Sequence, residues 1–101
     1  TQRDALAARD GGCRAPGCEK PPSWTEAHHI DYWARDRGNT NIADGILLCR
    51  YHHMLIHNNN WEILRRDGTY WLKPPPSVDP HQQITEMPSK NPLAAALRLA
   101  G

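Results

Sequence analysis

Residues 45–57 read GILLCRYHHMLIH, a short apolar run followed by a cysteine and three histidines. From the cysteine onward, Cys49, His53 and His57 recur every four residues, which is the spacing of side chains on one face of a helix. The stretch therefore predicts a short buried segment over residues 45–48. It leads into a helix that presents metal-ligand side chains on one face.

Two further cysteines stand upstream. Cys13 and Cys18 flank the turn sequence Arg-Ala-Pro-Gly, while Cys49 and His52 are separated by two residues. Together they form a Cys3His set, the donor chemistry of structural zinc sites. We expect these four residues to bind a structural Zn²⁺ that stabilises a domain with a thin apolar core. On spacing alone His53 is an alternative to His52, and a Cys13–Cys18 disulfide is the alternative to zinc.

Four further histidines form a second group, His28, His29, His53 and His57. His53 and His57 share a helix face and can bind one cation. Residues 23–30 predict a strand that ends in His28-His29, and adjacent strand residues point to opposite faces. Only one of these two can therefore join the ion bound by the helix. The alternative is a solvated strand end beside an ordinary exposed helix face.

Other segments predict the elements around this centre. Residues 2–10 are good helix formers that end at Gly11-Gly12. Asp67-Gly68 lies between two apolar-rich runs and predicts a β-hairpin. These patterns indicate one domain over residues 1–73. We expect residues 74–101 to form a Pro-rich extended tail that ends in a short helix, with Asn91 as its cap.

Composition limits the classes of partner. The chain has 101 residues, with 12 basic and 11 acidic side chains and a net charge of +1, so any phosphate contact must come from a local patch. No apolar run approaches the length of a membrane span, so we expect no membrane partner. Three cysteines cannot all pair and no segment resembles a signal peptide, which favours the cytoplasm. Because the first residue is Thr and not Met, we expect the chain to be part of a longer protein.

The combined pattern resembles the HNH endonuclease family of the ββα-metal superfamily, especially the zinc-finger-containing modules at the C-terminal end of larger actinobacterial proteins. It is also similar to colicin-type nuclease domains. The segment His28–Ile30 matches the first signature, Asp44 stands at the position of the family's Asn, and His53 and His57 match the closing pair. The resemblance covers about residues 10–64. It implies an α+β fold with a small ββα-metal core, to which a zinc knuckle, a β-hairpin and flanking helices are added.

The resemblance also implies an activity, the metal-dependent hydrolysis of DNA phosphodiester bonds. His28, His53 and His57 would hold the catalytic divalent cation, and His29 would be the general base that activates water. Imidazole ligands suit Zn²⁺, Mn²⁺, Ni²⁺ or Co²⁺ better than Mg²⁺. Asp44 can accept the hydrogen bonds of the family's Asn but cannot donate them. We nevertheless expect activity to be retained.

Five arginines in the loop, the helix and the hairpin are candidates for contacts with the phosphates of double-stranded DNA: Arg35, Arg37, Arg50, Arg65 and Arg66. A solvated surface of mixed charge is an equally good interpretation of each of them. The alternative function is a non-catalytic zinc-knuckle module that binds nucleic acid. In this alternative the replacement of the family's Asn by Asp44 would mark the loss of cleavage activity. The chain has no Phe and four tryptophans, Trp24, Trp33, Trp61 and Trp71. We expect three of these four, without specifying which, to lie in the core.

Overall fold

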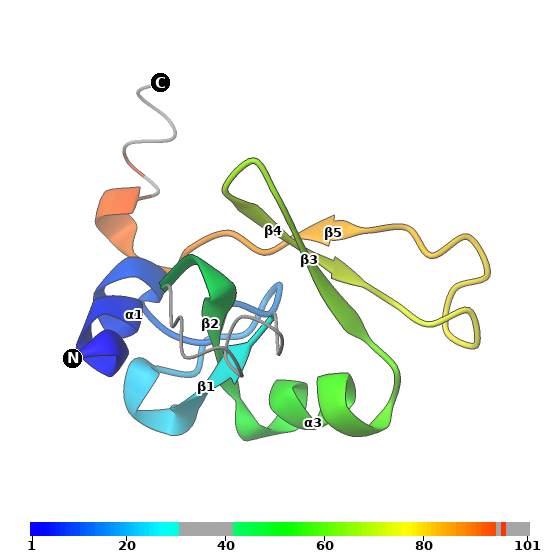
Figure 1. Ribbon diagram of the computed structural model, residues 1–101, viewed down its shortest axis with the longest axis horizontal. Coiled ribbons are helices and arrows are strands. Elements are labelled where there is room, and N and C mark those ends of the chain that lie inside the picture. The colour runs from blue at the N-terminus through cyan, green and yellow to red at the C-terminus, as the bar shows by residue number, and fades with distance from the viewer. Residues whose placement is uncertain (31–41, 95, 97–101) are drawn as a thin grey trace.

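The apolar run at the centre of the sequence forms a strand on which the rest of the molecule is built (Figure 1). The structure is a computed structural model, and it describes residues 1–30, 42–94 and 96. It is an α+β fold with two small antiparallel sheets. The elements in chain order are α1 (Gln2–Asp10), η1 (Pro22–Trp24), β1 (Thr25–His29), η2 (Ile42–Asp44), β2 (Gly45–Cys49), α3 (Arg50–Asn58), β3 (Glu62–Arg66), β4 (Thr69–Lys73) and β5 (Thr85–Glu86).

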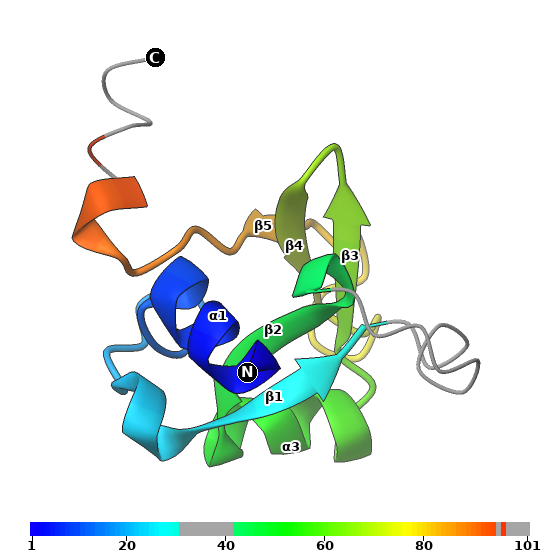
Figure 2. The ribbon, with the colours of Figure 1, turned by 60° about the vertical axis from the view of Figure 1, so that its left-hand side comes forward.

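Strands β1 and β2 form an antiparallel pair that lies between two helices. Their register runs from Thr25 opposite Cys49 to His29 opposite Gly45. Helix α1 packs on β2 from one side and α3 packs on both strands from the other, as Figure 2 shows. All five residues of β2 are buried, as expected for a strand that is covered on both faces. Strand β2 leads directly into α3, so the side chains of the sheet and those of the helix are held at fixed positions relative to one another.

Helix α1 has the ends that its sequence predicts. The Thr1 hydroxyl caps the first turn by accepting from the amide of Asp4, and Gly11 ends the helix in the left-handed region at φ 70°. Leu6 is the buried apolar residue of the helix. A Cβ placed on Gly45 would lie 3.5 Å from the Cδ1 of Leu6, an ordinary van der Waals distance, so the Leu6 side chain lies directly over β2 at this point.

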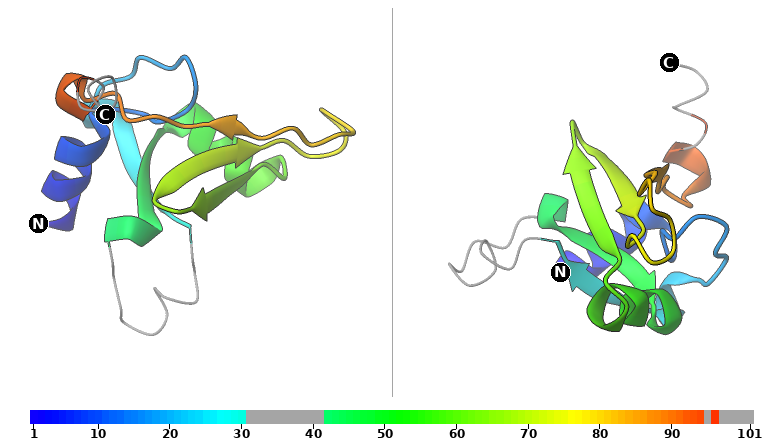
Figure 3. Two further views of the ribbon diagram at one scale, coloured as in Figure 1. Left: turned by 90° about the horizontal axis from the view of Figure 1, so that it is seen from above. Right: turned by 90° about the vertical axis from the view of Figure 1, so that its right-hand side faces the viewer.

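The predicted hairpin is formed by β3 and β4. Asp67 and Gly68 both have positive φ, 53° and 78°, which is the backbone that two-residue hairpin turns require. Strand β5 pairs with β4 and completes a three-stranded sheet beside the first one (Figure 3).

The segment after β4 forms turns at residues 76–78 and 80–81 and then packs closely on the domain. Residues 85–86 add β5 to the hairpin, and Met87 is fully buried in the core. Residues 92–94 are helical, and the Oδ1 of Asn91 accepts from the amide of Leu93, as its predicted capping role requires. Residues 85–87 are therefore part of the packing and not of a separate tail, because they extend the second sheet and add Met87 to the small core.

The core differs from the expectation of buried tryptophans. It consists of small aliphatic and sulfur-containing side chains around Tyr70, with Ile46, Leu48 and Ile63 among them. Trp24 is 65% exposed, and the ammonium of Lys20 lies over its ring, 4.6 Å from the ring centroid. Trp61 and Trp71 are half-buried, and Trp33 lies outside the described residues. None of the three described tryptophans belongs to the buried core cluster, so the prediction of three core tryptophans was wrong.

Candidate metal centres

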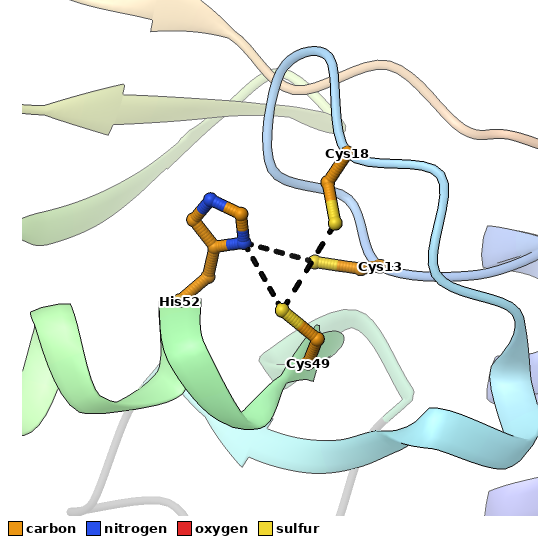
Figure 4. Close-up of side chains that lie close together, drawn as sticks. All are labelled: Cys13, Cys18, Cys49 and His52. Carbon is orange, nitrogen blue, oxygen red and sulfur yellow. Dashed lines mark hydrogen bonds between the residues drawn. The ribbon is translucent and has the colours of Figure 1, made fainter.

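The first candidate centre brings together the four residues of the predicted Cys3His set. Cys13 and Cys18 come from the loop after α1, Cys49 is the last residue of β2, and His52 lies in the first turn of α3 (Figure 4). One ligand atom from each residue lies within 4.8 Å of all the others, so the group can hold a metal ion. The three cysteines are free thiols, and the alternative of a Cys13–Cys18 disulfide does not apply.

The spacing of the ligand atoms fits a tetrahedral ion. The His52 Nδ1 lies 3.6 Å from the Cys13 Sγ and 3.1 Å from the Cys49 Sγ, and the sulfurs of Cys18 and Cys49 are 4.0 Å apart. Zinc bonds of about 2.3 Å to sulfur and about 2.0 Å to nitrogen imply ligand separations of roughly 3.5 to 3.8 Å around a tetrahedron. The group is therefore nearly preformed for such an ion.

The environment of the thiols differs from one cysteine to the next. Burial raises the pKa of Cys13 to about 12, although the backbone amides of Cys49 and Ala15 act in the opposite direction. Burial also opposes ionisation of Cys18, but the backbone amide of Lys20 and neighbouring groups outweigh it and lower the pKa of that thiol. Without metal, Cys13 is held as a thiol, so metal binding at this group has to release its proton.

The second candidate centre is a cluster of three imidazoles between β1 and α3. His28, His53 and His57 each offer a ring nitrogen, and these atoms lie within 4.8 Å of one another. The Nε2 atoms of His53 and His57 are 3.0 Å apart, and the ring of His28 stands edge-on to both. Of the paired histidines His28-His29, the structure therefore brings His28 to the helical pair.

His28 is suited to act as a neutral donor. It is 5% exposed, and burial, followed by the neighbouring His53, His57 and His29, lowers its pKa to about 4. The imidazole is thus uncharged at neutral pH, with a lone pair available to a cation. Three imidazoles, one on a strand and two on a helix, form a set that can hold a divalent cation and leave some of its positions open.

Glu26, which was not among the predicted site residues, contacts this cluster. Its Oε2 lies 2.7 Å from the Nδ1 of His53, and this contact is the largest cause of the lowered pKa of Glu26. A carboxylate on Nδ1 holds the proton of the imidazole there and directs the Nε2 lone pair toward a cation. The two-residue period of strand β1 was the signal for Glu26, since it shares the face of His28.

His29 and Asp44 lie at the open end of the β1–β2 pair. His29 is half-buried and pairs with Gly45, whose missing Cβ faces Leu6 of α1, so His29 points to the face opposite His28. The backbone carbonyl of Asp44 accepts from the amide of Ile30 at 2.7 Å. The residue at the expected Asn position thus connects β2 to the chain immediately after His29.

Comparison with known proteins relates the chain to mycobacterial proteins. It is 41% identical over 80 residues to the uncharacterized protein Rv1128c of Mycobacterium tuberculosis and 36% identical over 80 residues to the uncharacterized protein Mb1179c of Mycobacterium bovis. Each match covers 77% of this chain and 17% of the relative. The chain thus spans about a sixth of the length of these relatives. No family model matches it, and no solved structure matches it.

Two of the predicted DNA-contacting arginines pair with acidic groups of the protein. Arg65 donates to Asp44, and Arg50 lies 3.5 Å from Glu26. Arg66 is exposed at the end of β3. Arg35 and Arg37 lie outside the described residues. The cations on the described surface are therefore partly balanced by carboxylates, which reduces the charge they present to a phosphate.

A pocket of about 510 Å³ opens beside the histidine cluster. His28 and His57 line it, together with Ile30 after β1, Ile56 of α3, Trp61, and Glu62, Ile63 and Leu64 of β3. The cluster is therefore accessible to a molecule larger than water from this side.

Proposed function

We propose that the chain is a metal-dependent endonuclease module of the HNH type, with β1, β2 and α3 as a ββα-metal core, acting on DNA. One observation carries the proposal: the ring nitrogens of His28, His53 and His57 converge from a strand and a helix, and His29 is the next residue of that strand. This combination supplies both a cation site and a candidate base at one strand end. The pocket beside it leaves room for a substrate.

The residues take distinct roles in this proposal. His28, His53 and His57 hold a divalent cation (Zn²⁺, Mn²⁺, Ni²⁺, Co²⁺ or Mg²⁺), and Glu26 orients His53 through its Nδ1. When bound, the cation supplies positive charge that stabilises the phosphate in the transition state. A ring nitrogen of His29 accepts the proton of the attacking water. Asp44 holds the chain that carries His29, through its backbone bond to Ile30.

The Cys3His group has a different role from the histidine cluster. We propose that it binds a structural Zn²⁺ that joins the loop after α1 to the start of α3. Structural zinc sites are closed by four protein ligands, whereas catalytic sites keep a position for water or substrate. The four converging donors at Cys13, Cys18, Cys49 and His52 support the closed type, and the three imidazoles support the open type.

Plasmid cleavage with and without a chelator tests the activity. The parent is expected to nick or linearise supercoiled DNA with added Mn²⁺, Ni²⁺ or Mg²⁺ and to lose this activity with chelator. His29→Ala is expected to lose cleavage while its metal content stays that of the parent. His81→Ala is the matched control, because His81 is an exposed histidine outside both groups.

The same experiment separates the alternative function. A non-catalytic nucleic-acid-binding module would retain DNA in a gel-shift assay but leave the plasmid intact with every metal. An active His29→Ala protein would remove His29 from the role of base. The chain carries few unpaired cations in its described part, so we expect weak DNA binding that falls steeply with salt.

A further inference from the structure

The ammonium group of Lys90 is bound to the loop that carries two of the four Cys3His ligands. Its Nζ donates to the backbone carbonyls of Cys13 and Ala15 at 2.9 Å each and to that of Cys18 at 2.5 Å. A lysine ammonium has three donors, and all three are used here. The lysine and the loop are 72 to 77 residues apart in sequence, so the contact is made only by the fold.

Lys90 is held in place by its own backbone and by its neighbours. Its amide donates to the carbonyl of Asp10 at 2.7 Å, and the Oγ of Ser89 donates to the carbonyl of Arg9 at 2.5 Å. The segment also approaches α1 so closely that a Cβ on Gly11 would lie 2.5 Å from the backbone nitrogen of Asn91. We refer to residues 87–91 as the C-terminal strap. Its position is fixed at the end of α1, next to the cysteine loop.

At its other end the strap is bound to the core and to the second sheet. The amide of Met87 donates to the carbonyl of Tyr70 at 2.8 Å, and the carbonyl of Met87 accepts from the guanidinium of Arg14 at 2.7 and 3.1 Å. Arg14 follows Cys13 directly and is buried. The strap therefore contacts the cysteine loop at two places, through Arg14 and through Lys90.

The charge of Lys90 matches the charge of a loaded Cys3His group. Three thiolates, a neutral imidazole and a divalent cation sum to one negative charge. Cys13 and Cys49 are buried, and a buried charge without a partner is costly. The Lys90 ammonium supplies one positive charge on the loop that holds two of the thiolates. The carbonyls of the loop bind the Lys90 ammonium. The amides of Ala15 and Lys20 instead face the sulfurs of Cys13 and Cys18, where they stabilise the thiolate form.

We propose that Lys90 is a positioning residue of the Cys3His metal site, which balances its charge and fixes the Cys13–Cys18 loop for metal binding. The metal affinity of this site then depends on the C-terminal strap as well as on its four ligands. The inference rests on the metal proposed for this group, but it is independent of nuclease activity and of the histidine cluster.

Metal titration of the full chain tests the proposal. Co²⁺ is added to the metal-free protein, and the thiolate-to-cobalt absorption reports the Cys3His group alone, because the histidine cluster has no sulfur. Competition of the bound Co²⁺ or Zn²⁺ with a chelator then gives the affinity.

Lys90→Gln removes the charge at nearly constant length, and Lys90→Arg keeps the charge but replaces the three diverging donors with a planar fork. Lys20→Gln is the matched control, because Lys20 lies beside the same loop but its ammonium contacts Trp24.

We expect Lys90→Gln to bind metal at the thiolate group about 10- to 100-fold more weakly than the parent, as is typical when a residue that supports metal ligands is lost. Lys90→Arg should recover part of this loss, and Lys20→Gln should stay within about twofold of the parent. Equal affinity of parent and Lys90→Gln would overturn the proposal. So would a Lys90→Gln protein that stays unfolded at saturating Zn²⁺, since Lys90 would then serve the fold independently of metal. A parent without any thiolate-to-cobalt band would instead contradict the metal site itself.

Discussion

The Nη1 of Arg65 donates to the Oδ1 of Asp44 at 2.5 Å, which joins the hairpin strand β3 to the start of β2. The backbone carbonyl of the same Asp44 accepts from the amide of Ile30, the residue after His29. Asp44 thus contacts β3 through its side chain and the end of β1 through its backbone. An Asn at this position could not form an ion pair with Arg65, so this ion pair depends on the carboxylate of Asp44.

We predict that Asp44 and Arg65 are energetically coupled. Asp44→Ala, Arg65→Ala and the double variant form a cycle whose coupling should be about 0.5 to 1 kcal/mol in unfolding free energy, the upper range for a pair with one partly exposed member. Arg65 is 38% exposed, which limits the gain by solvent screening. Denaturant unfolding at saturating Zn²⁺ measures it, and Arg66→Ala, the exposed neighbour, should be nearly neutral. A coupling of zero would mean that the contact contributes nothing to stability.

Glu26→Gln should weaken the cation site of the histidine cluster. The amide can still contact His53, but it lacks the negative charge that keeps the imidazole proton on Nδ1 and makes Nε2 a better donor. We expect a loss of about tenfold or more in Ni²⁺ or Zn²⁺ affinity at this site by calorimetric titration, with the thiolate-to-cobalt band unchanged. Glu19→Gln, which removes an exposed charge beside the cysteine loop, is the control. If both variants bind alike, Glu26 does not orient His53.

Removal of metal should unfold the domain. The Cys3His group joins the loop after α1 to α3, and the surrounding core is small. Metal binding and folding are coupled in such domains. We predict that a chelator abolishes the cooperative thermal transition seen by circular dichroism and that Zn²⁺ restores it. His52→Ala should show the same loss at Zn²⁺ concentrations that saturate the parent, whereas His81→Ala should melt as the parent does. A chelated parent that keeps its transition would show that the fold does not need the metal.

Local patterns were enough to predict the elements that position the candidate sites. The four-residue spacing of Cys49, His53 and His57 predicted α3, and Asp67-Gly68 predicted the hairpin, because both signals depend on neighbours in sequence. The limits of α1 followed from the Gly that ends it. These features need no information about distant residues.

Contacts between distant segments could not be predicted in this way. Lys90 binds a loop more than 70 residues away, and nothing in its neighbours indicates a role. Arg65 was one candidate for contact with DNA phosphates, and its ion pair with Asp44 could not be predicted, since a basic residue on a hairpin has the same local pattern in either role. The Pro-rich composition after Lys73 predicted an extended chain, but residues 76–78 and 80–81 form turns, and composition does not reveal what the segment packs against.

Met87→Ala should be among the most destabilising substitutions outside the metal ligands. Met87 is fully buried in the cluster that contains Cys13, Ile46 and Tyr70, so its removal leaves a cavity. Truncation of a buried Met typically costs about 2 to 5 kcal/mol. Denaturant unfolding with Zn²⁺ held in excess measures the loss, and Val78→Ala, an exposed apolar residue of the same segment, should change the unfolding free energy by less than about 0.5 kcal/mol. A Met87→Ala protein as stable as Val78→Ala would show that the segment beyond β4 adds nothing to the core. The domain would then end at the hairpin.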